Sequence, residues 1–116
     1  MNMRKTRLLV KHYDPIGKKY ELIKPLGYVL EGSYCAYKMI NASIDAPRSI
    51  YWEVTDAKSG IIILRAESLK VAIAVFVRYE KKRFEEWKDN HKKEYEKRCE
   101  EIEELNAEEL RKELEK

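Results

Sequence analysis

Few residues of this sequence could do chemistry, and their spacing matches no common catalytic or metal site. The chain has two histidines, His12 and His91, and two cysteines, Cys35 and Cys99, which stand far apart along the sequence. Structural zinc sites use converging ligands in short motifs such as CxxC, and the sequence has no such motif. A Cys–His nucleophilic pair would also need an orienting group and an oxyanion donor. We therefore predict that Cys35 is a buried structural residue and that the chain has no metal ligand and no catalytic residue.

The glycines and carboxylates give no sign of nucleotide chemistry. The four glycines, Gly17, Gly27, Gly32 and Gly60, stand alone, so the sequence contains no P-loop and no dinucleotide-binding pattern. Carboxylates are abundant only near the C-terminus, where they alternate with Lys and Arg. This alternation is typical of ion pairs on a solvated helix face. The sequence thus predicts a protein that is not an enzyme and that uses no cofactor.

The aromatic residues are more informative. Eight tyrosines and two tryptophans in 116 residues exceed the needs of one small core, so we expect some of them to be exposed. Residues 1–30 also carry seven Lys or Arg against two Asp or Glu. Aromatic rings among cations bind single-stranded nucleic acid by stacking on its bases and neutralising its phosphates. They are also common in protein–protein interfaces. Core tyrosines with a solvated basic rim are the third interpretation, and the sequence does not separate the three.

Turn residues and strand-forming residues predict two β-hairpins. Residues 6–13 and 20–23 flank a turn that contains Pro15 and Gly17, and residues 50–55 and 61–64 flank a turn that ends at Gly60. The four apolar residues 61–64 cannot alternate with polar ones, so we expect them to form a central strand that is covered on both faces. Between the hairpins, apolar residues in 33–40 recur at three- and four-residue spacings and predict a short helix.

A long charged helix is predicted for the C-terminal part of the chain. Ser68 is a candidate N-cap, and apolar residues then recur every three or four positions without Gly or Pro. This pattern predicts one helix of about 35 to 40 residues, with a second N-cap at Asn106. Beyond residue 79 the apolar stripe is one residue wide per turn, which favours packing on a partner helix, and packing across the chain's own sheet is the equally weighted alternative. The stripe consists of Phe84, Trp87, Tyr95, Cys99, Ile102 and Leu105.

Together these elements predict an α+β protein of ββαββα order, with a four-stranded antiparallel sheet and two helices, the C-terminal one long and charged. Residues 1–80 would form a compact body, and residues 81–116 an extended charged helical segment continuous with it. No stretch reaches the roughly 18 to 20 apolar residues that cross a membrane, and the cysteines fit no disulfide framework. We therefore expect a cytoplasmic protein without membrane contact.

The leading functional prediction is a non-catalytic protein-binding or regulatory module that acts through the exposed helix on a protein partner or on its own copy, as a homodimer. Its size and charge density are typical of accessory and inhibitor proteins of phages and mobile elements, an association that rests on composition alone. The partner-binding candidates are Phe84, Trp87, Tyr95, Ile102 and Leu105. The alternative is a nucleic-acid-binding module that uses the basic, Tyr-rich N-terminal hairpin. Its candidates are Arg4, Lys5, Arg7, Lys11, Lys18, Lys19 and Tyr20.

Overall fold

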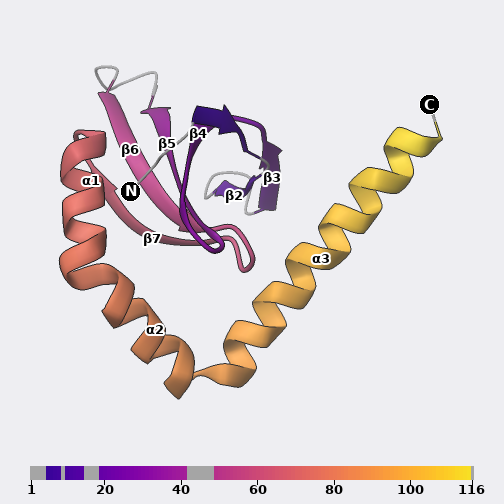
Figure 1. Cartoon of the computed structure of the whole chain (residues 1–116). Coiled ribbons are helices and arrows are strands. Elements are labelled where there is room, and N and C mark those ends of the chain that lie inside the picture. The colour runs from indigo at the N-terminus through magenta and orange to yellow at the C-terminus, as the bar shows by residue number, and fades with distance from the viewer. Residues whose placement is uncertain (1–4, 9, 15–18, 42–48, 116) are drawn as a thin grey trace.

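The computed structural model describes residues 5–8, 10–14, 19–41 and 49–115. It shows an α+β chain in which strands come first and helices follow (Figure 1). The strands are β1 (Lys5–Arg7), β2 (Val10–Asp14), β3 (Lys19–Ile23), β4 (Leu26–Glu31), β5 (Tyr34–Asn41), β6 (Ser49–Asp56) and β7 (Ile61–Ala66). The helices are α1 (Leu69–Val75), the π-helical turn η1 (Phe76–Glu80), α2 (Lys81–Asn90) and α3 (Lys92–Leu114).

Five of these strands form one antiparallel sheet in the order β1-β4-β5-β6-β7, and β2 and β3 pair separately. The predicted α+β class is confirmed, but the count of four strands in one sheet is wrong. The predicted helix at 33–40 is also wrong, because these residues form β5. Tyr34 and Ala36 point to one face of the sheet and Cys35 and Tyr37 to the other, and all four are buried. A short apolar run of this kind suits a strand that is covered on both faces as well as it suits a buried helix.

Each face of the sheet has its own cover. On one face α1, η1 and α2 pack over a core of Leu30, Tyr34, Ala36, Val54, Ala72, Phe76 and Phe84. On the other face Val10 of β2 and Ile23 of β3 pack with Leu8, Cys35 and Tyr37. The N-terminal hairpin predicted from the turn residues therefore exists, and it is a second layer instead of two more strands of the main sheet.

The second predicted hairpin is confirmed as β6 and β7, but β7 ends the sheet and is not central. A β-bulge, rather than a central position, explains why neighbouring residues of the apolar run at 61–64 are both covered. Val54 pairs with Leu64 and Thr55 pairs with Ile62, so Ile63 is an extra residue in β7. As a result Ile63 and Leu64 both pack against the helix-covered core, although they are neighbours in sequence.

The helical segment begins as predicted, since the backbone N–H of Val71 donates to Oγ of Ser68 at 3.2 Å. The prediction of a single long helix is wrong. The helical segment is interrupted at His91, where φ is −132° and ψ is 44°. Nδ1 of His91 lies 2.9 Å from the carbonyl oxygen of Trp87 and occupies the acceptor that the backbone N–H of a continuing helix would use. The predicted N-cap at Asn106 is also wrong, because α3 runs through it without a break. No helix in the described part of the chain is long and apolar enough to cross a membrane.

The close approach of β5 and Leu8 to β4 requires Gly27. A Cβ atom there would collide with the carbonyl oxygen of Ala36 and lie 2.7 Å from Cδ1 of Leu8. Gly27→Ala should therefore lower the free energy of unfolding by about 1 to 3 kcal/mol, as overpacking does, measured by urea denaturation. Gly32→Asn is the control, because Gly32 has open space around it and a φ of +53° that Asn tolerates. Equal effects of the two substitutions would contradict the steric explanation.

Candidate binding groove

The break at His91 sets α2 and α3 apart as the two arms of a V, and the turn between β6 and β7 lies between the arms (Figure 1). An aromatic cluster fills the inside of the V. Phe84 stacks on Trp87 at a centroid distance of 5.8 Å, and Trp87 stacks on His91 at 5.1 Å. Tyr95 of α3 meets Phe84 edge to face at 6.1 Å. Stacked and edge-to-face pairs of this kind stabilise beyond their buried area, so they help to fix the angle between the arms.

A buried carboxylate ties α3 to the sheet. Asp56, at the end of β6, is fully buried and accepts a hydrogen bond from the hydroxyl of Tyr95 at 2.7 Å. It also accepts from Ser59 Oγ at 2.6 Å and from Ser33 Oγ. Burial, followed by the hydrogen bond to Asp56, raises the pKa of the Tyr95 phenol above its ordinary value. The Tyr95 hydroxyl therefore stays a donor at neutral pH, and this hydrogen bond positions the first turn of α3.

Between these elements lies a cavity of about 480 Å³, which we call the groove. Its lining residues are Gly60, Ile61, Ile62, Phe84, Trp87, Glu94 and Arg98. Ile61 and Ile62 are consecutive strand residues whose side chains point to opposite faces of the sheet. A cavity lined by both residues lies against β7, which has β6 as its one neighbour among the described strands. The groove therefore combines an apolar floor with access to the outer edge of a strand, and the charged side chains stand on the α3 wall.

The structure brings three of the five predicted partner-binding residues together. Phe84 and Trp87 line the groove, and Tyr95 belongs to the same aromatic cluster. Ile102 and Leu105 lie further along α3. The predicted exposed stripe does not exist as one surface, because Phe84 is 8% exposed, Cys99 6% and Ile102 3%. Trp87 and Tyr95 are half-buried against the sheet core. The stripe is thus largely covered within the chain, which leaves the groove as the accessible part.

The predicted nucleic-acid-binding residues are only partly described. Lys5 and Arg7 lie exposed on β1, at the edge of the sheet. Arg4 and Lys18 fall outside the described residues, and the side chains of Lys11, Lys19 and Tyr20 are likewise outside the description. Lys38 and Trp52 are absent from the predicted set, and their ammonium nitrogen and ring centroid lie 5.7 Å apart across β5 and β6. Had 33–40 been recognised as a strand, its alternation would have placed Lys38 on the face of Tyr34 and Ala36, where the structure leaves Lys38 exposed beyond the buried residues.

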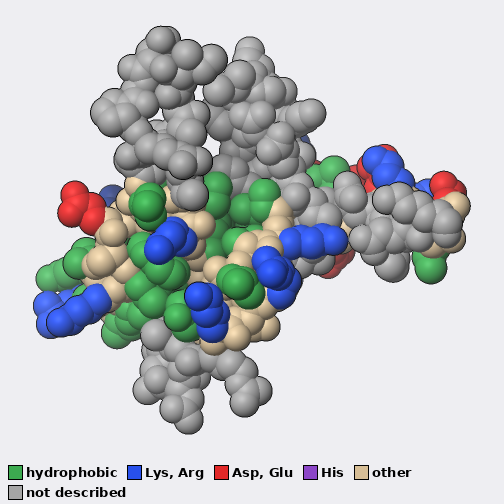
Figure 2. Space-filling model, turned by 90° about the horizontal axis from the view of Figure 1, so that it is seen from above, with side chains coloured by type: hydrophobic (Ala, Val, Ile, Leu, Met, Phe, Trp, Pro, Cys, Tyr) green, Lys and Arg blue, Asp and Glu red, His purple; other side chains and the backbone are tan. Residues whose placement is uncertain are grey.

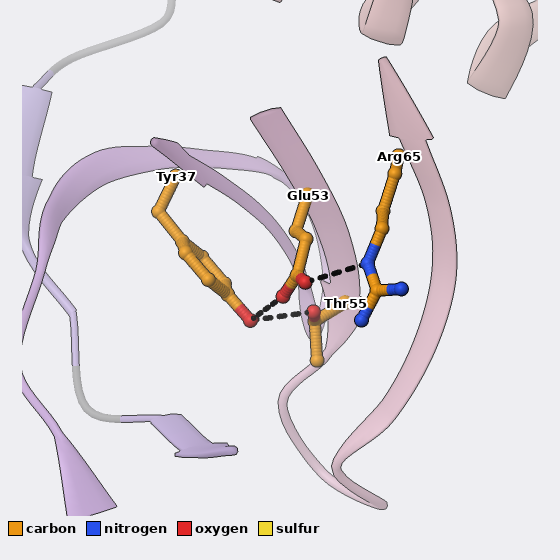
Figure 3. A network of polar contacts seen from close by, with 4 residues as sticks. All are labelled: Tyr37, Glu53, Thr55 and Arg65. Carbon is orange, nitrogen blue, oxygen red and sulfur yellow. Dashed lines mark hydrogen bonds and ion pairs between the residues drawn. The ribbon is translucent and has the colours of Figure 1, made fainter. Parts of the chain in front are cut away.

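Among the described residues, a second buried polar cluster lies on the sheet face opposite the helices and is drawn in Figure 3. Glu53 accepts a hydrogen bond from the hydroxyl of Tyr37 at 3.0 Å and from Nε of Arg65 at 2.9 Å, and the Tyr37 hydroxyl also lies 2.8 Å from Oγ1 of Thr55. Tyr37 and Glu53 have no exposed surface, and burial raises the pKa of the Tyr37 phenol. A carboxylate that is paired and enclosed in this way cannot reach a substrate, so we assign the cluster a structural role, in which the partners of Glu53 compensate its burial.

Both cysteines are free and buried. Cys35 is buried as predicted, and burial raises the pKa of its thiol to about 12, so the nucleophilic thiolate is scarce at neutral pH. Within the described ranges no group of three or more His, Cys, Asp or Glu side chains is arranged to hold a metal ion. Comparison with protein-family models, with curated proteins and with solved structures finds no match for this chain.

Proposed function

We propose that the chain is a non-catalytic protein-binding module that holds an extended segment of a partner protein in the groove, beside β7. The observation that carries this proposal is the cavity of about 480 Å³ whose apolar floor, Ile61, Ile62, Phe84 and Trp87, adjoins a sheet edge. Its volume lies within the range of roughly 300 to 1,000 Å³ that is typical of ligand sites. A regulatory role would follow from occupation of this groove by the partner.

The edge position of β7 favours an extended segment as the occupant. Among the described strands, β7 has a neighbour on one side only, which is β6. A strand in this position presents backbone N–H and C=O groups to any chain that lies alongside it, and added strands are a common mode of peptide recognition. A partner segment could therefore extend the sheet while alternate side chains enter the groove.

The lining chemistry favours a protein segment over a small polar ligand. Small-molecule sites usually have a few polar groups that converge on the ligand from several sides. Here the charged groups, Glu94 and Arg98, lie on one wall, one turn apart on α3. They suit a segment that carries one or two large apolar side chains with polar residues between them.

Selection from a library of random peptides provides the test, with Trp87 as the reporter. In a Trp52→Phe background the emission of Trp87 should shift when a selected peptide binds, because this ring lines the groove. Ile62→Glu places a carboxylate in the apolar floor and should weaken binding by about tenfold or more, which corresponds to loss of a well-buried contact. Val71→Glu is the matched control, since Val71 is 50% exposed on α1.

Two outcomes would contradict the proposal: no peptide selected at all, or equal weakening by Ile62→Glu and Val71→Glu. Sedimentation of the free protein distinguishes the chain's own copy as the occupant. A concentration-dependent dimer that Ile62→Glu disrupts would replace the partner segment with a second copy in the same groove.

A further inference from the structure

A second surface lies at the other end of the sheet, away from the groove. Directly paired strand residues share a face, so the register places Lys5 beside Tyr28, Arg7 beside Leu26, and Lys38 beside Trp52. Ile50, two residues before Trp52 in β6, lies on the same face. Lys5, Arg7, Leu26, Lys38 and Ile50 are exposed, and Tyr28 and Trp52 are half-buried. We call these seven residues the basic aromatic face.

This face offers two aromatic rings at its centre. Tyr28 and Trp52 lie 6.2 Å apart between centroids, and they come from β4 and β6 with β5 between them. The ammonium group of Lys38 lies 5.7 Å above the Trp52 ring. Neither ring is fully covered by α1, although both touch the edge of the core beneath it. Partly exposed rings on an antiparallel sheet are the kind of platform on which proteins stack unpaired bases.

The charge of this face has one sign. Lys5, Arg7 and Lys38 provide three cations, and none of the seven residues that define the face is acidic. Figure 2, which looks onto this end of the molecule, shows Lys and Arg side chains among hydrophobic ones, with Asp and Glu at the margins. The Arg7 guanidinium is held in place by its 2.8 Å hydrogen bond to the carbonyl oxygen of Lys24. Fixed cations around stacking rings complement a flexible polyanion whose bases are free.

We propose that the basic aromatic face binds single-stranded nucleic acid, with bases on Tyr28 and Trp52 and phosphates on Lys5, Arg7 and Lys38. This proposal is independent of the groove, which lies at the opposite end of β6 and β7. It also differs from the sequence-based alternative, because two of its three cations are shared with that set but both rings are new. RNA and DNA present the same bases and phosphates to such a surface, and the test separates them.

The test measures fluorescence anisotropy of labelled oligo-U and oligo-dT of about 12 nucleotides, a length that fits known single-strand sites. Binding at low salt should weaken as salt rises, with a slope near −0.7 per contacted phosphate. Lys38→Glu should reduce affinity about tenfold and flatten the slope. Lys82→Glu makes the same charge change on exposed α2 and should leave affinity within about twofold. Tighter binding of one oligomer identifies RNA or DNA as the preferred strand.

Stacking needs a readout of its own, because Trp52→Ala also removes core contacts. In a Trp87→Phe background the emission of Trp52 should be quenched on binding, and Trp52→Ala should lower affinity at least about fivefold if it folds. Three results would each overturn the proposal: no binding at low salt, equal loss with Lys38→Glu and Lys82→Glu, or a duplex of the same length that binds as tightly as the single strand. Binding of polyglutamate with the same affinity as oligo-U would also overturn it, in favour of an acidic protein partner.

Discussion

Asp56→Ala is expected to lower the free energy of unfolding by about 3 to 5 kcal/mol, because three hydroxyl donors would lose one charged acceptor. Hydrogen bonds to charged groups contribute about 1.5 to 3 kcal/mol each, and the contributions within one network do not simply add. Asp56 is fully buried and accepts from Ser33, Ser59 and Tyr95. These donors come from the β4–β5 turn, the β6–β7 turn and α3, so the substitution removes a joint between three parts of the fold. Urea denaturation measures the change.

Two further variants distinguish the loss of the hydrogen bonds to Asp56 from a general loss of core packing. Asp56→Asn keeps one acceptor oxygen and should cost clearly less than alanine. Tyr95→Phe removes the 2.7 Å bond to Asp56 that ties α3 to the sheet, together with the hydroxyl's contact to Cys99 within α3, so it should cost about 1.5 to 3 kcal/mol. It should also loosen the groove, which a change in Trp87 emission of the folded protein would report. A loss below about 1 kcal/mol for Asp56→Ala would show that water replaces the carboxylate and that the joint contributes little.

The elements that the sequence predicts correctly are those with local signals. Pro15 and Gly17 mark the first hairpin, the turn that ends at Gly60 marks the second, and the Ser68 side chain caps the first helix. In each case the signal and the structure lie within a few residues of one another. Turn conformation and N-capping depend on backbone geometry and side-chain hydrogen bonding at the site itself, so composition alone is informative.

The errors arise where distant partners decide the conformation. Residues 34–41 form a strand because β4 and β6 pair with them on both sides, and spacing within the segment cannot show this. The position of β7 at the sheet edge depends on which strand finds which neighbour. The break at His91 depends on a side chain that binds the carbonyl of Trp87 and stacks on its ring. Tertiary pairing overrides local preference in all three places.

Part of the groove could be predicted from the sequence. Helical spacing identified Phe84, Trp87 and Tyr95 as one stripe, and the structure places them in one aromatic cluster. Asp56 and Glu53 were missed because a carboxylate is normally solvated, whether it ends a strand as Asp56 does or lies within one as Glu53 does. Their burial follows only from the β5–β6 pairing, which brings hydroxyl donors of Ser33 and Tyr37 to them. Ile102 and Leu105 extend the same helical stripe beyond the aromatic cluster, and their role in partner binding stays a prediction.

Alkaline pH is expected to unfold the protein more readily, because several buried groups keep their protons in the fold. Burial raises the pKa of the Cys35 thiol from 9.0 to about 12 and that of the Tyr34 phenol from 10.0 to about 12. Burial also raises the pKa values of the phenols of Tyr37 and Tyr95. Between about pH 9 and pH 12 the unfolded chain therefore binds fewer protons than the folded one. Stability from these groups is complete below pH 9 and declines as pH rises.

The decline should be visible in urea midpoints measured from neutral pH upward, at up to about 1.4 kcal/mol per pH unit for each group that titrates only on unfolding. Tyrosinate absorbance should appear together with loss of structure for the buried phenols, instead of before it. Tyr37→Phe should reduce the decline, since this phenol is fully buried. Tyr79→Phe should leave it unchanged, because Tyr79 is 65% exposed. A urea midpoint that stays constant to about pH 11 would mean that the phenols and the Cys35 thiol ionise within the folded protein, and that the sheet core admits water there.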